Sequence, residues 1–290
     1  SNRWVKKCFE KNKCIYLYNF MEESRFFDDY ESIKSNKLPY IYTESVDNDG
    51  INYIEISTGL VRAVPVFYKI EQDRLYVSDN IDILLSEKSK VAYNSLREFL
   101  VFSYVLGEKT LFGNVKQVQA GETLRCEVGS ILAKEDYFIY DSGEEFDLGR
   151  ETLLQEFEKV LYKTFELYTE KLKSKKIIVP LSGGYDSRLI VTMFKEFGLT
   201  DVLCVSYGIE GNFETKKASI VAQKLGYPLD IVVYKISDRI SIIDTADFLR
   251  YVEYASQKST QAHTQEYLMM TYIKKKYSFS PESVAFVPGH

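Results

Sequence analysis

Histidine and cysteine are scarce in this sequence, which has two histidines and four cysteines among 290 residues. The cysteines at positions 8, 14, 126 and 204 lie apart and form no C-x-x-C pair, so neither a zinc site nor a disulfide framework is indicated. We therefore expect four inert, buried thiols in a reducing cytoplasm.

Long apolar runs and an excess of basic residues are also missing. No run approaches the roughly 20 apolar residues that a membrane span needs. The sequence has 37 Lys and Arg and 42 Asp and Glu, which gives a net charge of −5. We expect no membrane and no nucleic-acid partner, because a general nucleic-acid binder needs a basic face.

The ends of the sequence indicate a piece of a longer protein. It begins with Ser-Asn instead of Met, which resembles a tag-cleavage scar, and stops in "VAFVPGH", which reads as a strand and the loop after it. We therefore expect the second domain to be truncated at the C-terminus.

The first half reads as a β-rich domain over residues 1–140. Short runs rich in Tyr, Val and Ile are broken by turn residues, which is typical of antiparallel strands, and one inserted helix is expected at 95–105. The opening "SNRWVKKCF" is read as a helical or irregular lead. The acidic stretch 141–150 is the predicted linker.

Residues 151–290 show a different pattern, in which amphipathic helices alternate with short apolar strands. A helix is expected at 151–173, and strands at 176–181, 201–208 and 229–234 are separated by helices that end at Gly198 and Gly226. Continuous apolar strands joined by helical crossovers indicate a parallel sheet covered on both faces. The fold class expected is α+β followed by α/β.

The stretch "IIVPLSGGYDSRLIVTMF" predicts an anion site. A strand ends at Leu181, a turn contains Gly183 and Gly184, and a helix begins near Ser187. A helix N-terminus offers unpaired N–H groups and the positive end of its dipole. We expect the glycines to take positive φ and approach a phosphate closely, with the hydroxyls of Ser182 and Ser187 as donors.

Asp186 is unexpected in this loop, because a carboxylate repels phosphate. Two interpretations fit equally: Asp186 is the N-cap of the helix, or it binds a Mg²⁺ ion that also contacts the phosphates. Arg188 adds positive charge in the first turn of the helix.

The S-G-G-x-D-S string resembles the pyrophosphate loop of ATP pyrophosphatases, which cleave ATP to AMP and pyrophosphate. The resemblance implies a domain of the adenine-nucleotide α-hydrolase type, with ATP and Mg²⁺ as cofactors and Asp186 as the metal ligand. It implies that adenine is framed by the end of the next strand, so the expected nucleotide-binding residues are Leu181, Ser182, Gly183, Gly184, Asp186, Ser187, Val205, Tyr207 and Gly208.

The flanking sequence resembles the asparagine synthetase family. "GLVRAVPVFYKIEQDRLYVSDNIDILL" and "EKTLFGNVKQVQAGETLRCEVG" are similar to its glutaminase domain, and "SYGIEGNFETKKASIVAQKLGYPLDIVVY" to its second βα unit. That glutaminase uses an N-terminal cysteine, which this sequence lacks, so the first half reads as a degenerate, amidotransferase-like remnant. The closer relatives in kind are β-lactam synthetases and lasso-peptide cyclases, which dispense with glutamine.

The resemblance implies an ATP-dependent carbon–nitrogen ligase that adenylates a carboxylate, releases pyrophosphate and forms an amide. Its partners would be a small-molecule or peptide carboxylate and an amine, and a homodimer is one arrangement the sequence allows. A tRNA-modifying enzyme, a nucleotide amidase and a non-catalytic nucleotide-binding descendant stay open. No catalytic residue is assigned, and the second Mg²⁺ ligand of the family would lie beyond His290.

Two further residues have simpler interpretations. His263 follows a polar run that opens a helix, and a surface or capping role is favoured over a base. Glu214 starts the helix after "YGIEGN", where an acid favours the helix dipole whatever its function.

Overall fold

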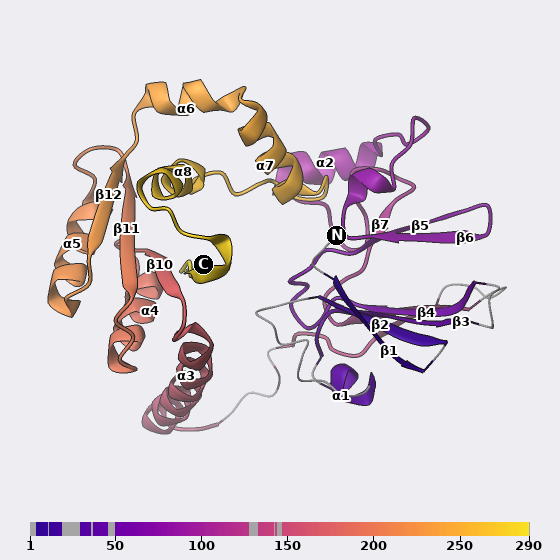
Figure 1. The fold of residues 1–290 in the computed structure, drawn as a ribbon, viewed down its shortest axis with the longest axis horizontal. Helices are drawn as coiled ribbons and strands as arrows, with labels where there is room; N and C mark the ends of the chain where they lie inside the picture. Colours follow the sequence, from indigo (N-terminus) through magenta and orange to yellow (C-terminus); the bar gives the residue numbers. More distant parts are fainter. Residues whose placement is uncertain are drawn as a thin grey trace. The chain divides into compact units, whose positions relative to one another are not determined.

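The computed structural model describes residues 4–10, 12–18, 30–35, 37–45, 50–127, 133–141, 143 and 147–289. The chain divides into two units (Figure 1). Ser1–Gly143 with Tyr251–Ala262 form the N-terminal unit, and Glu144–Arg250 with His263–His290 form the C-terminal unit. Each is described by itself.

Two antiparallel sheets build the N-terminal unit. The larger has the order β1-β2-β3-β4-β8-β9, and the smaller has the order β6-β5-β7. Their bounds are β1 Trp4–Glu10, β2 Lys13–Tyr18, β3 Tyr40–Ser45, β4 Ile51–Ser57, β5 Phe67–Glu71, β6 Arg74–Ser78, β7 Lys116–Gln117, β8 Glu122–Glu127 and β9 Ala133–Asp136, with helices α1 Tyr30–Ser35 and α2 Tyr93–Phe102.

The core of this unit follows from the strand alternation, because successive side chains point to opposite faces. Ile56 and Leu124 of the larger sheet pack with Val66, Tyr68 and Val118 of the smaller sheet and its flanks. A second cluster, under α1, contains Ile15, Leu17, Ile33, Tyr40 and Tyr42. The predicted β-rich first half and its inserted helix are confirmed.

The expectation of a helical or irregular lead is wrong, because Trp4–Glu10 is strand β1. It pairs antiparallel with β2 at the edge of the larger sheet. Charged residues such as Lys6 are typical of edge strands, where they discourage pairing with another chain, and this charge obscured the strand pattern.

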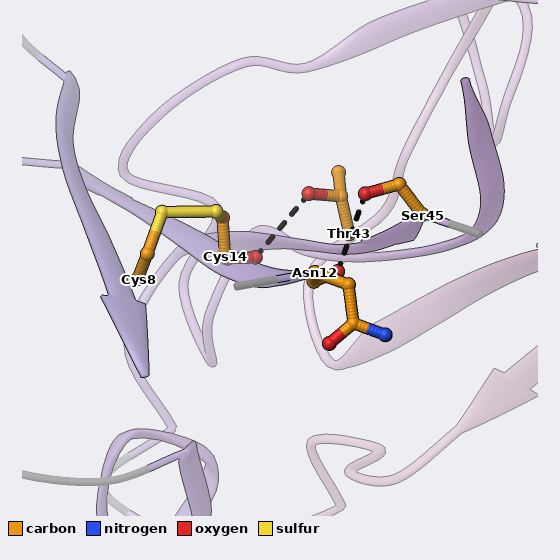
Figure 2. Close-up of a disulfide and its surroundings, with 5 residues drawn as sticks. All are labelled: Cys8, Asn12, Cys14, Thr43 and Ser45. Atoms are coloured by element: carbon orange, nitrogen blue, oxygen red, sulfur yellow. Dashed lines mark hydrogen bonds between the residues drawn. A yellow bond between two sulfur atoms is a disulfide. The ribbon is translucent and has the colours of Figure 1, made fainter. Parts of the chain in front are cut away.

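The expectation of four free thiols is also wrong, because a disulfide joins Cys8 and Cys14 (Figure 2). The two residues are direct partners across the β1–β2 hairpin, with Cα atoms 4.1 Å apart. This spacing suits a non-hydrogen-bonded antiparallel pair. Figure 2 also shows the Thr43 hydroxyl donating to the Cys14 carbonyl at 3.4 Å. Cys204 is buried as expected, and Cys126 is partly exposed.

Reduction of the disulfide is expected to destabilise the N-terminal unit by about 2 kcal/mol, because a cross-link over a sequence separation of six restricts the unfolded chain modestly. The measurement is urea unfolding followed by the fluorescence of Trp4, the one tryptophan, with and without dithiothreitol. The Cys8→Ser/Cys14→Ser protein should be insensitive to the reductant, whereas Cys126→Ser should behave as wild type. Equal stability of the oxidised and reduced wild type would contradict this expectation.

The C-terminal unit contains a four-stranded parallel sheet of order β12-β11-β10-β13. The elements are α3 Arg150–Leu172, β10 Lys176–Pro180, α4 Tyr185–Glu196, β11 Val202–Gly208, α5 Phe213–Leu225, β12 Leu229–Val233, α6 Ile236–Ile243, α7 Ala246–Ser256, α8 Tyr267–Lys276 and β13 Val284–Phe286. The predicted α/β fold is confirmed.

Helices cover both faces of this sheet, which explains why its strands are almost continuously apolar. On one face, Val179 and Cys204 pack against Phe165 of α3, Phe194 of α4 and Ala218 of α5. On the other, Ile178, Leu203 and Val205 pack against Met269 and Ile273 of α8. In Figure 1, α5 and α8 accordingly lie on opposite sides of β11 and β12.

Residues 251–262 return to the N-terminal unit, a feature that the sequence-based boundaries did not include. The N–H groups of Val105 and Leu111 donate to the carbonyls of Ser259 and Lys258 at 2.8 and 3.0 Å. Lys258 also pairs with Asp82 at 2.6 Å. Of the predicted linker 141–150, residues 142 and 144–146 lie outside the described part of the chain.

Among the described helices, none is long and apolar enough to cross a membrane.

Candidate functional site

The segment between β10 and α4 forms a turn closed by two serine side chains. Ser187 is buried, with 3% of the residue exposed. Its hydroxyl oxygen accepts the N–H of Ser182 at 3.1 Å and lies 3.0 Å from the Ser182 hydroxyl oxygen. The Ser182 hydroxyl in turn accepts the N–H of Gly184 at 3.1 Å. Both predicted hydroxyls are therefore together at the N-terminus of α4, where an anion could replace these mutual hydrogen bonds.

The two loop glycines do not have the predicted positive φ. Gly184 has φ −74°, and neither Gly183 nor Gly184 is among the residues with φ above zero. Their role is close approach. A Cβ on Gly183 would lie 3.4 Å from the Cα of Glu214, and one on Gly184 would lie 3.2 Å from the Ser182 hydroxyl oxygen. The loop is compact because both positions lack side chains.

Asp186 lies inside the first turn of α4, so the N-cap interpretation is wrong. The cap residue is Gly184, and the α4 terminus has no side-chain cap hydrogen bond. The Asp186 side chain is exposed, and within the described part of the chain no hydrogen bond or ion pair engages it. An acid here interacts favourably with the helix dipole, and its carboxylate is available to a cation.

Arg188 lies near the start of α4, where the sequence predicted a positive charge. Its Nε donates to the Gly184 carbonyl at 2.7 Å, and its guanidinium lies 4.4 Å from the ring centroid of Tyr185. Tyr185 is itself 83% exposed. Arg188 therefore ties the first turn of α4 to the loop carbonyl of Gly184 through a hydrogen bond.

Two segments distant in the sequence also contact the loop. Glu214, in the first turn of α5, lies against Gly183, and Gly289, just after β13, lies against Ser187. A Cβ on Gly289 would be 2.8 Å from the Ser187 nitrogen, so that only glycine fits there without movement. The sequence did not place either residue here. The available signal was that both follow strands next to β10, whose carboxyl ends share one edge of the sheet.

The three residues expected to frame adenine lie at the end of β11, next to β10. Val205 is fully buried, and its carbonyl accepts the N–H of Leu181 at 2.8 Å. Gly208 has φ +144°, and its carbonyl accepts the N–H of Tyr234 at 2.7 Å. The structure thus brings Leu181 and Val205 into direct contact and places Gly208 at the strand end.

Tyr207 forms a small cluster with Tyr234, which follows β12, and with Glu266, the N-cap residue of α8. Its ring stacks on Tyr234 with centroids 5.5 Å apart, and its hydroxyl donates to Glu266 at 3.4 Å. Burial, together with the charge of Glu266, raises the pKa of the Tyr207 phenol well above its usual value. His263 Nδ1 lies 3.8 Å from Glu266, with the histidine side chain half exposed. The favoured surface role of His263 agrees with this position.

The donor set of the loop suits a phosphate chain with Mg²⁺. Mg²⁺ is usually bound through one or two carboxylates together with substrate phosphates, and keeps several waters. The described residues contain no group of three or more His, Cys, Asp or Glu side chains that could hold a metal alone. Asp186 precedes Ser187 at the N-terminus of α4, and no described residue engages its carboxylate. This arrangement fits a site in which Mg²⁺ is bound jointly by one protein carboxylate and by substrate phosphates.

One comparison with known proteins gives a match that lies mainly within the C-terminal unit. The family model for asparagine synthase matches residues 171–279, which is less than half of the chain. One solved structure that matches is the NH3-dependent NAD synthetase from Campylobacter jejuni, at 15% identity over 47% of this chain and 56% of that chain, with a TM-score of 0.32. At this score the likeness supports no conclusion, and the match spans little more than half of the synthetase chain. The curated proteins contain no match. The matched residues 171–279 run from the end of α3 to just beyond α8 and include the serine–glycine loop, and this part of the chain matches the asparagine synthase domain.

Proposed function

We propose that the protein is an ATP-dependent amide-bond-forming ligase of the asparagine synthetase type. The carboxylate of the substrate attacks the α-phosphate of ATP, which forms an acyl-adenylate and releases pyrophosphate. An amine then attacks the acyl carbon, and AMP leaves as the amide forms. The carboxylate substrate is a small molecule or a peptide.

The observation that carries this proposal is the loop of the asparagine synthase domain. The hydroxyls of Ser182 and Ser187, 3.0 Å apart, and the N-terminus of α4 would hold the departing pyrophosphate. Asp186 would hold Mg²⁺, which when bound neutralises charge on the phosphates. The end of β11 at Tyr207 and Gly208 would frame the adenine.

We propose that the ligase has no glutaminase activity of its own, because none of its cysteines is an activated nucleophile. Cys8 and Cys14 are joined to one another. Burial raises the pKa of Cys126, and raises that of Cys204 to about 12. A catalytic cysteine instead needs a lowered pKa.

The test is calorimetric titration of ATP into the chain, with and without Mg²⁺, followed by ATP–pyrophosphate exchange with pools of carboxylates. We expect binding that depends on Mg²⁺, and exchange with a subset of the acids. Absence of ATP binding would contradict the proposal. Binding without exchange in any pool would instead favour a non-catalytic nucleotide-binding descendant.

Gly289→Ala is expected to weaken Mg²⁺-dependent ATP binding, because the added Cβ would displace the segment after β13 or the Ser187 backbone. Overpacking of this kind costs about 1–3 kcal/mol, or roughly 5- to 150-fold in Kd. The matched control is Gly149→Ala, where nothing lies within 4 Å of the added Cβ. Equal affinities of the two variants in calorimetry would show that Gly289 has no part in the site.

We propose a cytoplasmic location, because the proposed reaction consumes ATP. Disulfides are uncommon in that compartment, so the redox state of Cys8 and Cys14 in cells checks this location directly. Thiol trapping should find them reduced if the protein is cytoplasmic, and an oxidised pair would argue for another compartment.

A further inference from the structure

The outer face of the larger sheet in the N-terminal unit carries a groove of about 770 Å³. Residues from α1, β3, β4 and β8 line it, and none of them belongs to the loop after β10. The lining residues are Tyr30, Lys34, Tyr42, Glu44, Asn52, Tyr53, Glu55, Arg125 and Glu127.

Glu55 forms the floor of this groove. It is 2% exposed, and its carboxylate accepts the hydroxyls of Tyr30 and Tyr40 at 2.5 Å, that of Tyr53 at 2.9 Å and Nε of Arg125 at 2.6 Å. The four donors satisfy both carboxylate oxygens. Glu55 therefore holds the neighbouring side chains in place and is not itself offered to a ligand.

Besides this network, the groove is lined by both hydrogen-bond acceptors and hydrogen-bond donors. Asn52 Oδ1 is buried and, within the described part of the chain, has no hydrogen-bond partner. Glu44 accepts the Tyr42 hydroxyl through Oε1 alone, at 2.5 Å. As donors, Lys34 has a side chain that is 42% exposed, with its ammonium 3.9 Å from Glu55. Arg125 bonds Glu55 and Glu135 through Nε and Nη1, and no described residue bonds its Nη2.

This mixture discriminates between classes of ligand. A cation would face the ammonium of Lys34 and the guanidinium of Arg125, and an anion would face the carboxylates of Glu44 and Glu127. A hydroxyl group donates and accepts at once, so neighbouring hydroxyls can match both the unpaired Asn52 oxygen and the basic donors. Tyr30 and Tyr42 stack on one another with ring centroids 4.4 Å apart, and the half-buried ring of Tyr53 adds apolar surface suited to C–H groups.

We propose that this groove is a carbohydrate-binding site, which accepts a neutral, polyhydroxylated ring through Asn52, Glu44, Lys34 and Arg125 and packs its C–H groups on Tyr53. This inference concerns the N-terminal unit and does not depend on the ligase function proposed for the C-terminal unit.

The experiment is saturation-transfer difference NMR on the whole chain with glucose, galactose, mannose, N-acetylglucosamine and maltose. Tetramethylammonium and inorganic phosphate serve as charged probes. We expect saturation transfer to at least one saccharide, carried by its ring protons, and competition between the saccharides that bind. No transfer to any saccharide would overturn the proposal, as would displacement of a bound saccharide by either charged probe at equal concentration.

Asn52→Leu tests the position of the site. Loss of the unpaired acceptor should reduce affinity for the bound saccharide by about tenfold. It should leave thermal stability unchanged or higher, because a buried unsatisfied oxygen is removed. Asn114→Leu is the matched control: Asn114 lies in the same unit, outside the groove, and its amide donates to the Ser89 hydroxyl at 3.2 Å. Equal saccharide affinity in the two variants would refute the assignment.

Discussion

Asp186→Asn is expected to weaken Mg²⁺-dependent ATP binding by roughly 10- to 150-fold, the range for a lost charged interaction of about 1.5–3 kcal/mol. The amide retains the shape of the side chain and removes the charge that a hard cation prefers. Because the carboxylate is exposed and no described residue bonds it, its removal disturbs no structural contact. Calorimetry of ATP with Mg²⁺ measures the change.

The control for this variant is Asp244→Asn, which replaces another exposed acid at the end of α6. It should bind MgATP as wild type does. Binding in the absence of Mg²⁺ should be similar in all three proteins or slightly better in Asp186→Asn, since a repulsive charge near the phosphates is gone. Unchanged Mg²⁺-dependent binding in Asp186→Asn would remove Asp186 from the metal site.

Glu55→Gln is expected to destabilise the N-terminal unit by about 3 kcal/mol, the scale of breaking a buried ion pair by removing one partner. The substitution neutralises the acceptor of three phenols and leaves Arg125 with only the exposed Glu135. Trp4 reports on this unit, since its indole donates to Asp79 at 3.0 Å and packs on the core between the two sheets. Urea unfolding followed by Trp4 fluorescence measures the loss.

The same carboxylate predicts a pH dependence of stability. Burial alone would raise the pKa of Glu55. The hydrogen bonds from four side chains outweigh this effect and lower the pKa from its ordinary 4.5 to about 2; the donors are Tyr30, Tyr40, Arg125 and Tyr53. A lowered pKa means that the folded state binds the proton less tightly than the unfolded state. The contribution is therefore complete above pH 4.5 and is lost as the pH falls toward 2. Wild type should lose stability over this window more steeply than Glu55→Gln.

Glu135→Gln provides the matched control, because Glu135 pairs with the same arginine but is 57% exposed. Exposed ion pairs contribute about 0–1 kcal/mol, so this variant should be nearly as stable as wild type and should retain its acid sensitivity. A similar loss from both substitutions would contradict the central role of Glu55.

The α/β half was predictable because its signals are local. Apolar strands such as 176–181 and helices ended by Gly226 can be recognised in short windows, and Gly226 is indeed the left-handed C-cap of α5. The serine–glycine loop combines strand, turn and helix within a dozen residues. The position of Ser182 and Ser187 at one helix terminus follows from that sequence alone.

The features that were missed depend on tertiary contacts. The Cys8–Cys14 bond requires the hairpin register that makes the two residues direct partners, and turn and register were not apparent in a charged edge strand. Glu214 and Gly289 meet the loop only because three strands end at one edge of a sheet. The φ angles of Gly183 and Gly184 depend on what packs against them, which no pattern of glycines specifies.

The return of residues 251–262 affects how the protein can be made and divided. The N-terminal unit is assembled from two pieces of chain separated by much of the C-terminal unit. During synthesis, the backbone partners of Val105 and Leu111 are made only after β10, β11 and β12 of the C-terminal unit, so this unit cannot finish folding in order along the chain. A gene cut once, at residue 143, would yield a fragment without those partners, and a faithful minimal version would need the second piece supplied by fusion or coexpression.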